Sequence, residues 1–424
     1  MSAPGVHPAF EADPHPGAPR ILFVGLGESS HTHAWIDLLA GAKLNVRLFA
    51  LPTGVPPADW PVRTYVSGPV PPAPPDARRA YLGFPHPDWR DLARAARARL
   101  RGAPRVWLEP DRDVLAEDWL AEIVRRWRPD VIHTFGIEPG SSFYLRARRR
   151  HALAGQGFWI AQDRGPDIWM NRHLPELAGT IRDVLAACDA LVCDNETNVA
   201  LAPELGLRPG RLAPLGIVPS TGGVDVDALS AARALSRPAE RRLVFWPKAY
   251  ECPQSKALPV FEALRLAVDR LPPCEIRMTA AIPETRMWFE TLPAAVRRLC
   301  RLDTRVPREE ALHLMASARV MLAPSLSDGI PNTLWEAMAT GALPVMSPIP
   351  PLLPLVEPGR HVLFARNLHP GEIADALVRA LTDDALVTRA ADENLPLVRA
   401  WADRAAIAPR VVAYYEEVAG RSRT

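Results

Sequence analysis

The sequence has 424 residues, of which 48% are hydrophobic and 23% charged, and its formal net charge at pH 7 is +2. This composition is typical of a soluble globular protein and excludes a largely disordered chain, while the length favours two or more domains. The small net charge gives no indication of a nucleic-acid partner. Five scattered cysteines form no CxxC pair, which indicates small buried residues in a reducing compartment.

No apolar run approaches the roughly 20 residues that span a bilayer. The N-terminus also shows no basic segment followed by an apolar one, so no signal peptide is predicted. We therefore expect a cytoplasmic protein. Residues 1–19 are rich in proline, histidine and alanine and are expected to form a loose tail.

The first strand is predicted over residues 21–24, a short apolar run that ends in a Gly/Ser loop. This loop contains Gly27 and Ser29, and a helical pattern begins near His31. The order of strand, Gly/Ser loop and helix is that of a Rossmann-like domain, but the third glycine of GxGxxG is absent and the dinucleotide signal is weak. Two histidines, His31 and His33, with no carboxylate nearby favour a polar loop over a metal site.

Residues 44–49 are expected to form the second strand, and the proline-dense region 52–87 allows one more, near 62–66. The segment from Arg90 to Arg105 then carries six arginines in a helical pattern with alanine and leucine. A solvated helix face explains such a run most simply. The alternative is docking on an anionic membrane surface, to which each basic residue would contribute about 1 kcal/mol.

After a predicted helix, a strand that ends at His133 is expected. The next buried run ends in Gln-Asp-Arg-Gly-Pro-Asp, which brings Asp163, Arg164 and Asp167 to the carboxyl end of a strand. Ligands of open α/β sheets bind at that edge. The cluster is therefore expected in a cleft, although an Arg–Asp pair that only orders the loop explains it equally well.

The second half of the chain restarts the same alternation of strands and helices. A strand over 243–246 leads into a polar loop with Lys248, Lys256 opens the next helix, and another strand is predicted over 275–280. The expected divisions are an N-terminal domain, a C-terminal domain and a terminal helix, over residues 20–230, 231–395 and 396–424.

The most informative stretch is a predicted strand–loop–helix–strand unit over residues 320–346. Pro331 at the helix entry and Gly341 at its exit are each favoured in those places. Asp328 precedes the helix and Glu336 lies about one turn inside it, so both carboxylates can face one cleft. Carboxylates accept strong hydrogen bonds from sugar hydroxyls, and the free N–H groups at a helix start suit a phosphate. The stretch therefore predicts a site for a phosphate-linked polyol.

The string Asp-Gly-x-Pro-x-x-x-x-Glu-Ala-Met-Ala-x-Gly, over residues 328–341, resembles the nucleotide-sugar signature of glycosyltransferase family 4. The usual signature is Glu-x7-Glu, whereas this chain has Asp-x7-Glu and resembles the Ser-Asp-Gly-Ile-Pro-Asn branch. Elements over residues 128–133, 221–225 and 357–359 are also similar to family elements, and the resemblance extends from Arg20 through nearly the whole chain. It implies the GT-B fold, an α/β architecture with two Rossmann-like domains, parallel sheets facing across a cleft and a terminal helix that returns to the N-terminal domain.

The resemblance also implies an activity: retaining transfer of a sugar from a nucleotide diphosphate sugar to an acceptor hydroxyl, without a metal or another cofactor. Catalytic sugar contacts would come from Asp328 and His133, although many members have His-x-His where this chain has His133-Thr134-Phe135, so the residue that takes this role stays open. The implied donor-binding residues are Lys248, Lys256, Gly329, Ile330, Pro331, Asn332, Thr333 and Glu336, with Glu336 on the ribose and the lysines on the diphosphate. The implied acceptor residues are Gly27, Ser29, His31, Asp163, Arg164 and Asp167.

Two other classes of function stay open. One is a different enzyme on the same fold, such as a nucleotide-sugar epimerase or a phosphorylase. The other is a non-catalytic nucleotide-sugar-binding protein, favoured by the aspartate at position 328 and by the missing arginine near Lys248. For a transferase, the acceptor would be a glycan, a lipid-linked molecule or a small molecule, and the sequence identifies neither the acceptor nor the nucleotide base nor the sugar.

Overall fold

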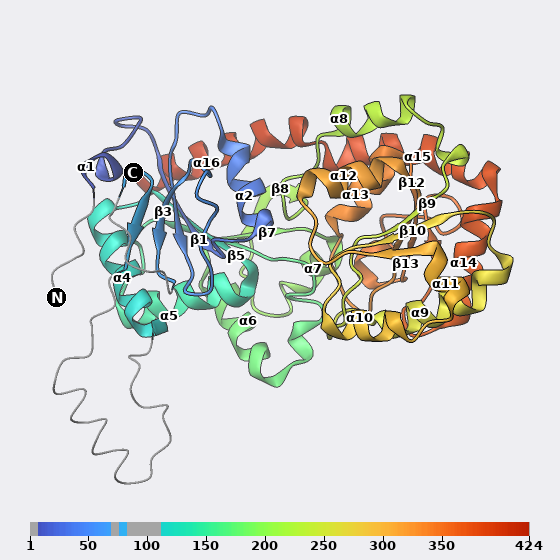
Figure 1. Cartoon of the computed structure of the whole chain (residues 1–424). Helices are drawn as coiled ribbons and strands as arrows, with labels where there is room; N and C mark the ends of the chain where they lie inside the picture. The colour runs from blue at the N-terminus through green and yellow to red at the C-terminus, as the bar shows by residue number, and fades with distance from the viewer. Residues whose placement is uncertain (1–6, 69–75, 83–111, 424) are drawn as a thin grey trace, which may run out of the picture. The chain divides into compact units, whose positions relative to one another are not determined.

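The computed structural model describes residues 7–68, 76–82 and 112–423, and the chain falls into two compact units (Figure 1). The first unit comprises Met1–Val192, Ala202–Leu215 and Arg410–Thr424, and the second comprises Cys193–Leu201 and Gly216–Pro409. Residues from Gly216 to the expected boundary at 230 thus group with the second unit. The arginine-rich segment from Arg90 to Arg105, with its predicted helix, lies outside the described residues.

The described part of the first unit is built on an eight-stranded sheet in the order β4-β3-β2-β1-β5-β6-β7-β8. Its strands are β1 Arg20–Gly25, β2 Asn45–Ala50, β3 Arg63–Val66, β4 Arg79–Tyr81, β5 Val131–Phe135, β6 Phe158–Gln162, β7 Ala190–Cys193 and β8 Leu212–Ile217. β1 pairs in parallel with β2 on one side and with β5 on the other, so the strand order reverses beside β1. Open parallel sheets bind ligands at such a reversal, which here means the loops after β1 and β5.

Helices of the first unit cover this sheet. They are α1 Pro8–Glu11, α2 Ser30–Ile36, α4 Arg112–Trp127, α5 Ser142–Arg150 and α6 Pro175–Ala187, together with the last part of α16 Arg404–Arg423. The β1 side chains from Ile21 to Val24 are fully buried. Because both faces of the sheet are covered, this strand reads as a continuous apolar run in the sequence rather than as an alternating one.

The second unit contains a parallel sheet, six-stranded in the described chain, in the order β11-β10-β9-β12-β13-β14. Its strands are β9 Leu243–Trp246, β10 Glu275–Met278, β11 Cys300–Leu302, β12 Ala318–Ala323, β13 Leu343–Met346 and β14 Leu363–Phe364. Its helices are α7 Glu196–Leu201, α8 Val226–Ala231, α9 Ala257–Ala267, α10 Pro283–Glu290, α11 Ala294–Leu299, α12 Arg308–Ser317, α13 Asn332–Thr340, α14 Pro370–Thr382 and α15 Asp384–Ala402. The order reverses between β9 and β12, so the loops that follow these two strands are where a ligand is expected.

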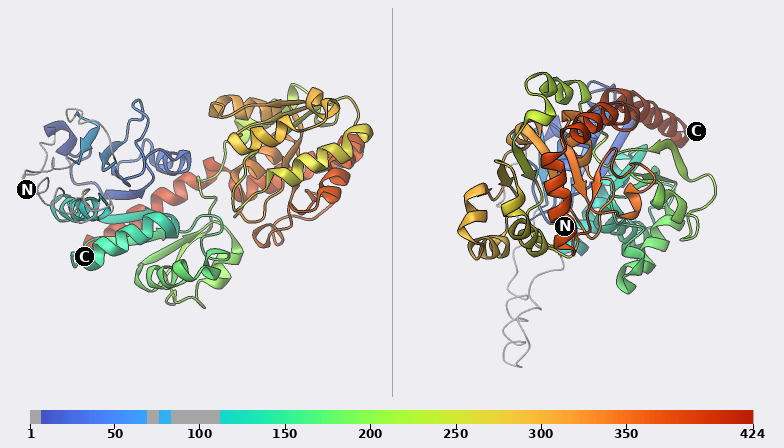
Figure 2. Two further views of the ribbon diagram at one scale, coloured as in Figure 1. Left: turned by 60° about the horizontal axis from the view of Figure 1, so that its bottom comes forward. Right: turned by 90° about the vertical axis from the view of Figure 1, so that its right-hand side faces the viewer.

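Two apolar cores lie on opposite faces of this second sheet, and Figure 2 shows helices on both sides of it. Val244 and Trp246 of β9 pack with α9 and α14. Phe245, between them, packs on the other face with α12 and α13. The alternation follows from the two-residue period of a strand, and it fixes α13 on one face with its first residue at the carboxyl edge of β12.

Several predicted elements differ from the structure. The expected loose tail is packed in its described part, residues 7–19, because Phe10 of α1 is fully buried and the Nε of Arg20 donates to Asp13 at 2.7 Å. The strand predicted over 275–280 ends at Met278, because Ala280 takes a positive φ of 63° that a strand cannot accommodate. The terminal helix predicted over 396–424 is divided into α15 and α16. Asp403 between them is extended, because Val224 and Asp403 form a parallel β-bridge there.

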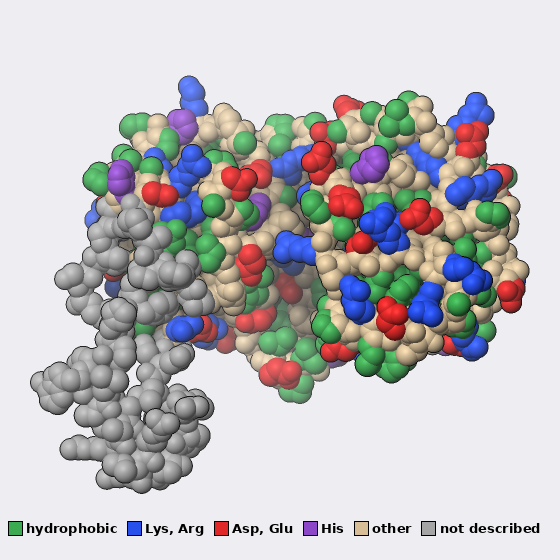
Figure 3. All heavy atoms as spheres, viewed as in Figure 1, with side chains coloured by type: hydrophobic (Ala, Val, Ile, Leu, Met, Phe, Trp, Pro, Cys, Tyr) green, Lys and Arg blue, Asp and Glu red, His purple; other side chains and the backbone are tan. Residues whose placement is uncertain are grey.

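On the face shown in Figure 3, acidic and basic side chains are interspersed. Within the described residues, no helix is both long and apolar enough to cross a bilayer.

Candidate functional site

Two loops of the second unit are joined at the carboxyl edge of its sheet. They are the loop between β9 and α9, residues 247–256, and the loop between β12 and α13, residues 324–331. Gln254 accepts hydrogen bonds at its carbonyl from the amides of Leu326 (2.7 Å) and Ser327 (3.3 Å). The Ser255 hydroxyl donates to the carbonyl of Pro324 at 3.3 Å. These hydrogen bonds hold the two loops side by side at the point where the strand order reverses.

Lys248 of the first loop and Asp328 of the second loop are in contact. The Lys248 Nζ donates to Asp328 Oδ2 at 2.5 Å, and the two side chains are 27% and 25% exposed. Burial alone would lower the pKa of Lys248, but the Asp328 carboxylate outweighs it with help from Tyr250 and Cys252, so the pKa is raised. The ammonium therefore stays charged at neutral pH beside a carboxylate, and the structure brings these two predicted donor residues together.

The amino end of α13 lies between the two carboxylates of the signature in the sequence. Pro331 precedes the helix in an extended conformation, and no side chain caps the first turn. Asn332 donates from Nδ2 to the Thr221 hydroxyl at 2.5 Å, whereas its Oδ1 and the Thr333 hydroxyl are buried without a hydrogen-bond partner among the described residues. An uncapped helix start with unused polar atoms suits an anion, since its N–H groups carry partial positive charge.

Gly329 and Ile330 shape the approach to this helix. The Gly329 amide donates to Asp328 Oδ1 at 2.9 Å, which turns the chain around the carboxylate. The Ile330 side chain is buried in the apolar core with α13. Ile330 therefore anchors the loop, and its contribution to a ligand would come from the backbone.

Glu336 lies one turn inside α13 and is 6% exposed. Its Oε1 accepts a hydrogen bond from the NH2 group of Arg308 at 2.9 Å. Burial raises the pKa of Glu336, and the positive charges of Arg308 and Lys248 offset this in part. Arg308 is the first residue of α12, which follows β11, and it is absent from the site residues predicted from the sequence. The sequence gives only a weak indication of its role, which is that an arginine follows a proline at the start of a helix and that this helix comes after a strand.

Lys256, the second predicted diphosphate ligand, is already paired within its own loop. Its Nζ lies 3.0 Å from Glu251 Oε1. The other oxygen of Glu251 accepts from the amide of Ala257, and Asn367 bonds both the amide and the carbonyl of Lys256. Lys256 thus differs from Lys248, because its charge is matched by a carboxylate outside the signature.

The loop after β1 in the first unit contains three predicted acceptor residues. Gly27 is buried, and a Cβ there would lie 2.8 Å from the Cβ of Ala50, so only glycine fits. Ser29 precedes α2, and His31 is exposed on its first turn. The histidine that fixes this loop is His33, whose Nε2 lies 2.7 Å from the Gly27 carbonyl oxygen.

His133 is the middle residue of β5 and is fully buried, whereas the sequence predicts it at the end of the strand and in contact with a donor sugar. Its Nδ1 lies 2.6 Å from the Tyr415 hydroxyl and its Nε2 3.3 Å from Gln162 Oε1. Burial lowers the pKa of His133 to about 3, so the ring is neutral. With both nitrogens engaged and no exposed surface, His133 presents no atom to a ligand in this conformation. Phe135, at the position of the second family histidine, is an apolar neighbour in the same ring cluster.

Asp163, Arg164 and Asp167 lie in and after the turn that follows β6. Asp167 Oδ2 accepts hydrogen bonds from the amides of Ile137 (2.8 Å) and Arg164 (3.0 Å), which links this turn to the one after β5. Burial raises the pKa of Asp167 to about 7. The Arg164 guanidinium lies over the Phe135 ring at 4.6 Å, and Asp163 is fully buried. These contacts order two loops at the carboxyl edge of the first sheet, which is one of the two roles that the sequence allows for the cluster.

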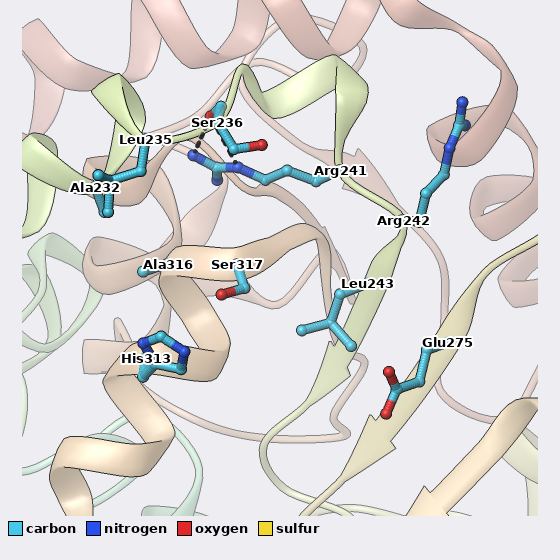
Figure 4. Close-up of a pocket in the computed structure, with 10 residues that line it drawn as sticks. All are labelled: Ala232, Leu235, Ser236, Arg241, Arg242, Leu243, Glu275, His313, Ala316 and Ser317. Atoms are coloured by element: carbon cyan, nitrogen blue, oxygen red, sulfur yellow. Dashed lines mark hydrogen bonds between the residues drawn. The ribbon is translucent and has the colours of Figure 1, made fainter.

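A cavity of about 420 Å³ lies elsewhere in the second unit. Figure 4 shows that it is lined by the amino ends of two strands, at Leu243 and Glu275, and by His313 of α12. Arg241 turns toward the carbonyl of Ser236, to which its Nε donates at 3.2 Å. This cavity is at the opposite edge of the sheet from the signature loops and contains none of the predicted site residues. Among the described residues, no three His, Cys, Asp or Glu side chains are grouped as metal ligands.

Comparison with known proteins gives one family match and many structural ones. Residues 258–383 match the family model described as Glycosyl transferases group 1. No curated protein sequence matches the chain. Sucrose-phosphate synthase from Thermosynechococcus elongatus is similar in structure, with a TM-score of 0.64 at 15% identity over 95% of this chain and 100% of that one.

Two other solved structures are similar at the same level. HepE from Anabaena, solved with UDP-glucose, has a TM-score of 0.64 at 13% identity over 93% of this chain and 98% of its own. A Listeria monocytogenes protein assigned as a UDP-N-acetylglucosamine 2-epimerase has a TM-score of 0.60 at 12% identity, over 93% and 95%. The chain therefore has the GT-B fold, and residues 258–383 of its second unit match the group 1 glycosyltransferases.

Proposed function

We propose that this chain is a retaining glycosyltransferase that moves a sugar, a hexose in the simplest case, from a nucleotide diphosphate sugar to an acceptor hydroxyl. The observation that carries the proposal is the set of groups at the carboxyl edge of the second sheet, where an uncapped α13 start accompanies the Lys248–Asp328 pair and Glu336. A helix start and a lysine suit a diphosphate, and two carboxylates suit the hydroxyls of ribose and sugar. The UDP-glucose complex of HepE supports the same class of donor for this fold.

In the proposed reaction, the diphosphate binds at the α13 start and draws Lys248 toward itself, while Asp328 accepts hydrogen bonds from the sugar. Negative charge develops on the departing diphosphate oxygen as the bond to the anomeric carbon breaks, and Lys248 and the helix start stabilise that charge. The same oxygen takes the proton of the acceptor hydroxyl. The acceptor oxygen bonds to the anomeric carbon on the face that the diphosphate leaves, which retains the configuration and requires neither a protein nucleophile nor a metal.

The proposed acceptor residues belong to the first unit, in the loops after β1 and β6 that contain Gly27, Ser29, His31 and the Asp163–Asp167 turn. A glycan, a lipid-linked molecule or a small molecule is the proposed acceptor, in a cytoplasmic pathway of glycan or glycoconjugate synthesis. Contact with a membrane surface through the segment from Arg90 to Arg105 is part of this proposal only for a lipid-linked acceptor.

A nucleotide-sugar epimerase is the second candidate, since the Listeria protein assigned to that class shares the fold. The two functions differ in their need for an acceptor. An epimerase converts the donor when no acceptor is present, whereas a transferase consumes donor in proportion to the acceptor supplied.

The proposal is tested by a thermal-shift screen of nucleotide diphosphate sugars on the wild type, Glu336→Gln and Glu309→Ala. A ligand at 100 times its dissociation constant stabilises a protein by about 2.7 kcal/mol. We expect one donor to shift the wild type and the exposed control Glu309→Ala alike, and Glu336→Gln to lose most of that shift. Turnover is then measured with this donor and pooled acceptors.

The outcomes separate the candidates. Donor consumption that requires an acceptor supports the transferase, and consumption without one supports the epimerase. Binding without any turnover favours the non-catalytic protein, and the absence of binding to every donor refutes all three.

A further inference from the structure

Arg308 covers the carboxylate that is proposed to hold the ribose. The Arg308 side chain is 61% exposed, whereas that of Glu336 is 7% exposed. One NH2 group of Arg308 donates to Glu336 Oε1 at 2.9 Å. An exposed guanidinium on a buried carboxylate leaves its other N–H donors directed to the surroundings, since a guanidinium has five in a fixed plane.

The position of Arg308 follows from the sheet. The residue opens α12 directly after the loop that leaves β11, at the edge of the sheet where the loops after β9 and β12 also lie. α12 packs against α13, which carries Glu336. The contact therefore joins two elements that flank the candidate nucleotide site rather than two exposed side chains on one helix.

Two positive charges on the elements around α13 affect the pKa of Glu336. Arg308 of α12 and Lys248 of the β9–α9 loop are the groups that lower its pKa. On α8 and α15, which also pack against α13, Asp227 and Arg399 are paired with each other at 2.8 Å, and Asp392 is paired with Arg233. Lys248 is itself engaged by Asp328. Arg308 is thus the one cation in direct contact with Glu336 within the described residues.

We propose that Arg308 is a positioning residue of the ribose subsite, which holds Oε1 of Glu336 so that Oε2 accepts the hydrogen bonds of the ribose diol. This inference rests on the proposed function of the site as a nucleotide-sugar site. A fixed carboxylate distinguishes ribose from deoxyribose, because a missing hydroxyl leaves a buried acceptor without a partner. The neighbouring positive charge also favours the ionised form of Glu336, by lowering the pKa that burial raises, and only the ionised form accepts with both oxygens.

The test measures the binding of UDP, GDP and ADP, each beside its 2′-deoxy form, by calorimetry between pH 6 and pH 8. The variants are Arg308→Gln, Arg308→Lys and Arg305→Gln, the last as the matched control, since Arg305 is an exposed arginine in the loop that leads to Arg308. We expect the wild type to prefer one ribonucleotide over its deoxy form on the order of tenfold, as the loss of one hydrogen bond to a charged group predicts.

In Arg308→Gln this preference should fall toward unity. The affinity for the ribonucleotide should also decline more steeply than in the wild type as the pH is lowered, because removal of the positive charge raises the pKa of Glu336 further. Arg308→Lys should restore the pH profile of the wild type through its charge, and Arg305→Gln should behave as the wild type. Equal weakening of both sugar forms at every pH would show that Arg308 only attracts the diphosphate, and an unchanged Arg308→Gln would also overturn the inference. If the wild type binds none of the three nucleotides, the proposed function fails as well.

Discussion

Ala280 adopts a left-handed backbone conformation, with a φ of 63°, two residues after β10 ends. Its amide donates to the Thr304 carbonyl at 2.5 Å, and the next amide, of Ala281, donates to Asp303 at 3.2 Å. These bonds hold the loop after β10 to the loop after β11, which leads to Arg308. The local strain is therefore part of how the edge of the sheet near the candidate site is built.

We expect Ala280→Gly to stabilise the protein by about 1 kcal/mol. A left-handed residue with a Cβ costs roughly 1–2 kcal/mol, and the entropy that glycine adds to the unfolded chain cancels only part of this relief. The measurement is the urea midpoint followed by tryptophan fluorescence. Ala281→Gly is the matched control and should destabilise, since Ala281 has no positive φ to relieve. If both substitutions destabilise equally, the strain at Ala280 is refuted.

Among the contacts between elements, the turn Thr221–Asp225 is held against the junction of α15 and α16. The Val224 amide donates to the Ala402 carbonyl at 2.8 Å, and the Arg404 amide donates to the Val224 carbonyl at 3.0 Å. A Cβ on Gly223 would lie 2.3 Å from the Ala402 carbonyl oxygen, and its φ is 86°. The turn also supplies Thr221 to Asn332 at the start of α13, so it supports the candidate site.

Gly223→Ala should therefore destabilise the second unit by more than about 2 kcal/mol, because strain of roughly 1–2 kcal/mol from the positive φ is added to a collision with backbone. Gly216→Ala is the control, since Gly216 has a φ of 69° and open space around its missing Cβ. The difference between the two unfolding free energies measures the collision. Equal losses would mean that the end of α15 moves away from the turn at little cost in free energy.

At the scale of the whole chain, the terminal helix α16 is joined to the first sheet by a buried polar chain. Trp35 Nε1 donates to the Tyr415 hydroxyl at 2.9 Å, that hydroxyl lies 2.6 Å from His133 Nδ1, and His133 Nε2 is 3.3 Å from Gln162 Oε1. The neutral His133 accepts from Tyr415 and donates to Gln162 in this arrangement, which gives each group one consistent role.

Tyr415→Phe should destabilise the first unit by about 1–3 kcal/mol, because it leaves Trp35 and His133 with unsatisfied buried nitrogens. Tyr414→Phe serves as the control, as Tyr414 makes no side-chain bond of this kind in the described structure. Hydrogen exchange of β1 and β5 amides, with the unfolding free energy, measures the effect. A loss no larger in Tyr415→Phe than in the control would mean that the polar chain contributes nothing to docking of the helix.

Sequence patterns were sufficient for elements whose structure is decided locally. The strands near 21–24 and 320–323 are continuous apolar runs because both faces of each parallel sheet are covered. Pro331 and Gly341 bound α13 because the first favours a helix entry and the second has the left-handed φ of 84° that ends a helix. The spacing between Asp328 and Glu336 follows from the same short helix. One stretch of sequence therefore predicted both carboxylates of the candidate site in the second unit.

The tertiary structure alone decided which polar groups are partnered. The sequence predicts His133 at a strand end, whereas β5 continues to Phe135 and the Nδ1 of His133 meets the hydroxyl of Tyr415, which is 282 residues away. Arg308 reaches Glu336 across 28 residues through the packing of α12 on α13. Lys248 meets Asp328, whereas Lys256 meets Glu251, although both lysines lie in the same loop region. A hydrogen bond or ion pair between residues far apart in the sequence depends on distances of a few ångströms, which no local pattern encodes. The sequence by itself therefore determined the helices, the strands and the signature. The packing of these elements decided which partner each charged or polar side chain has.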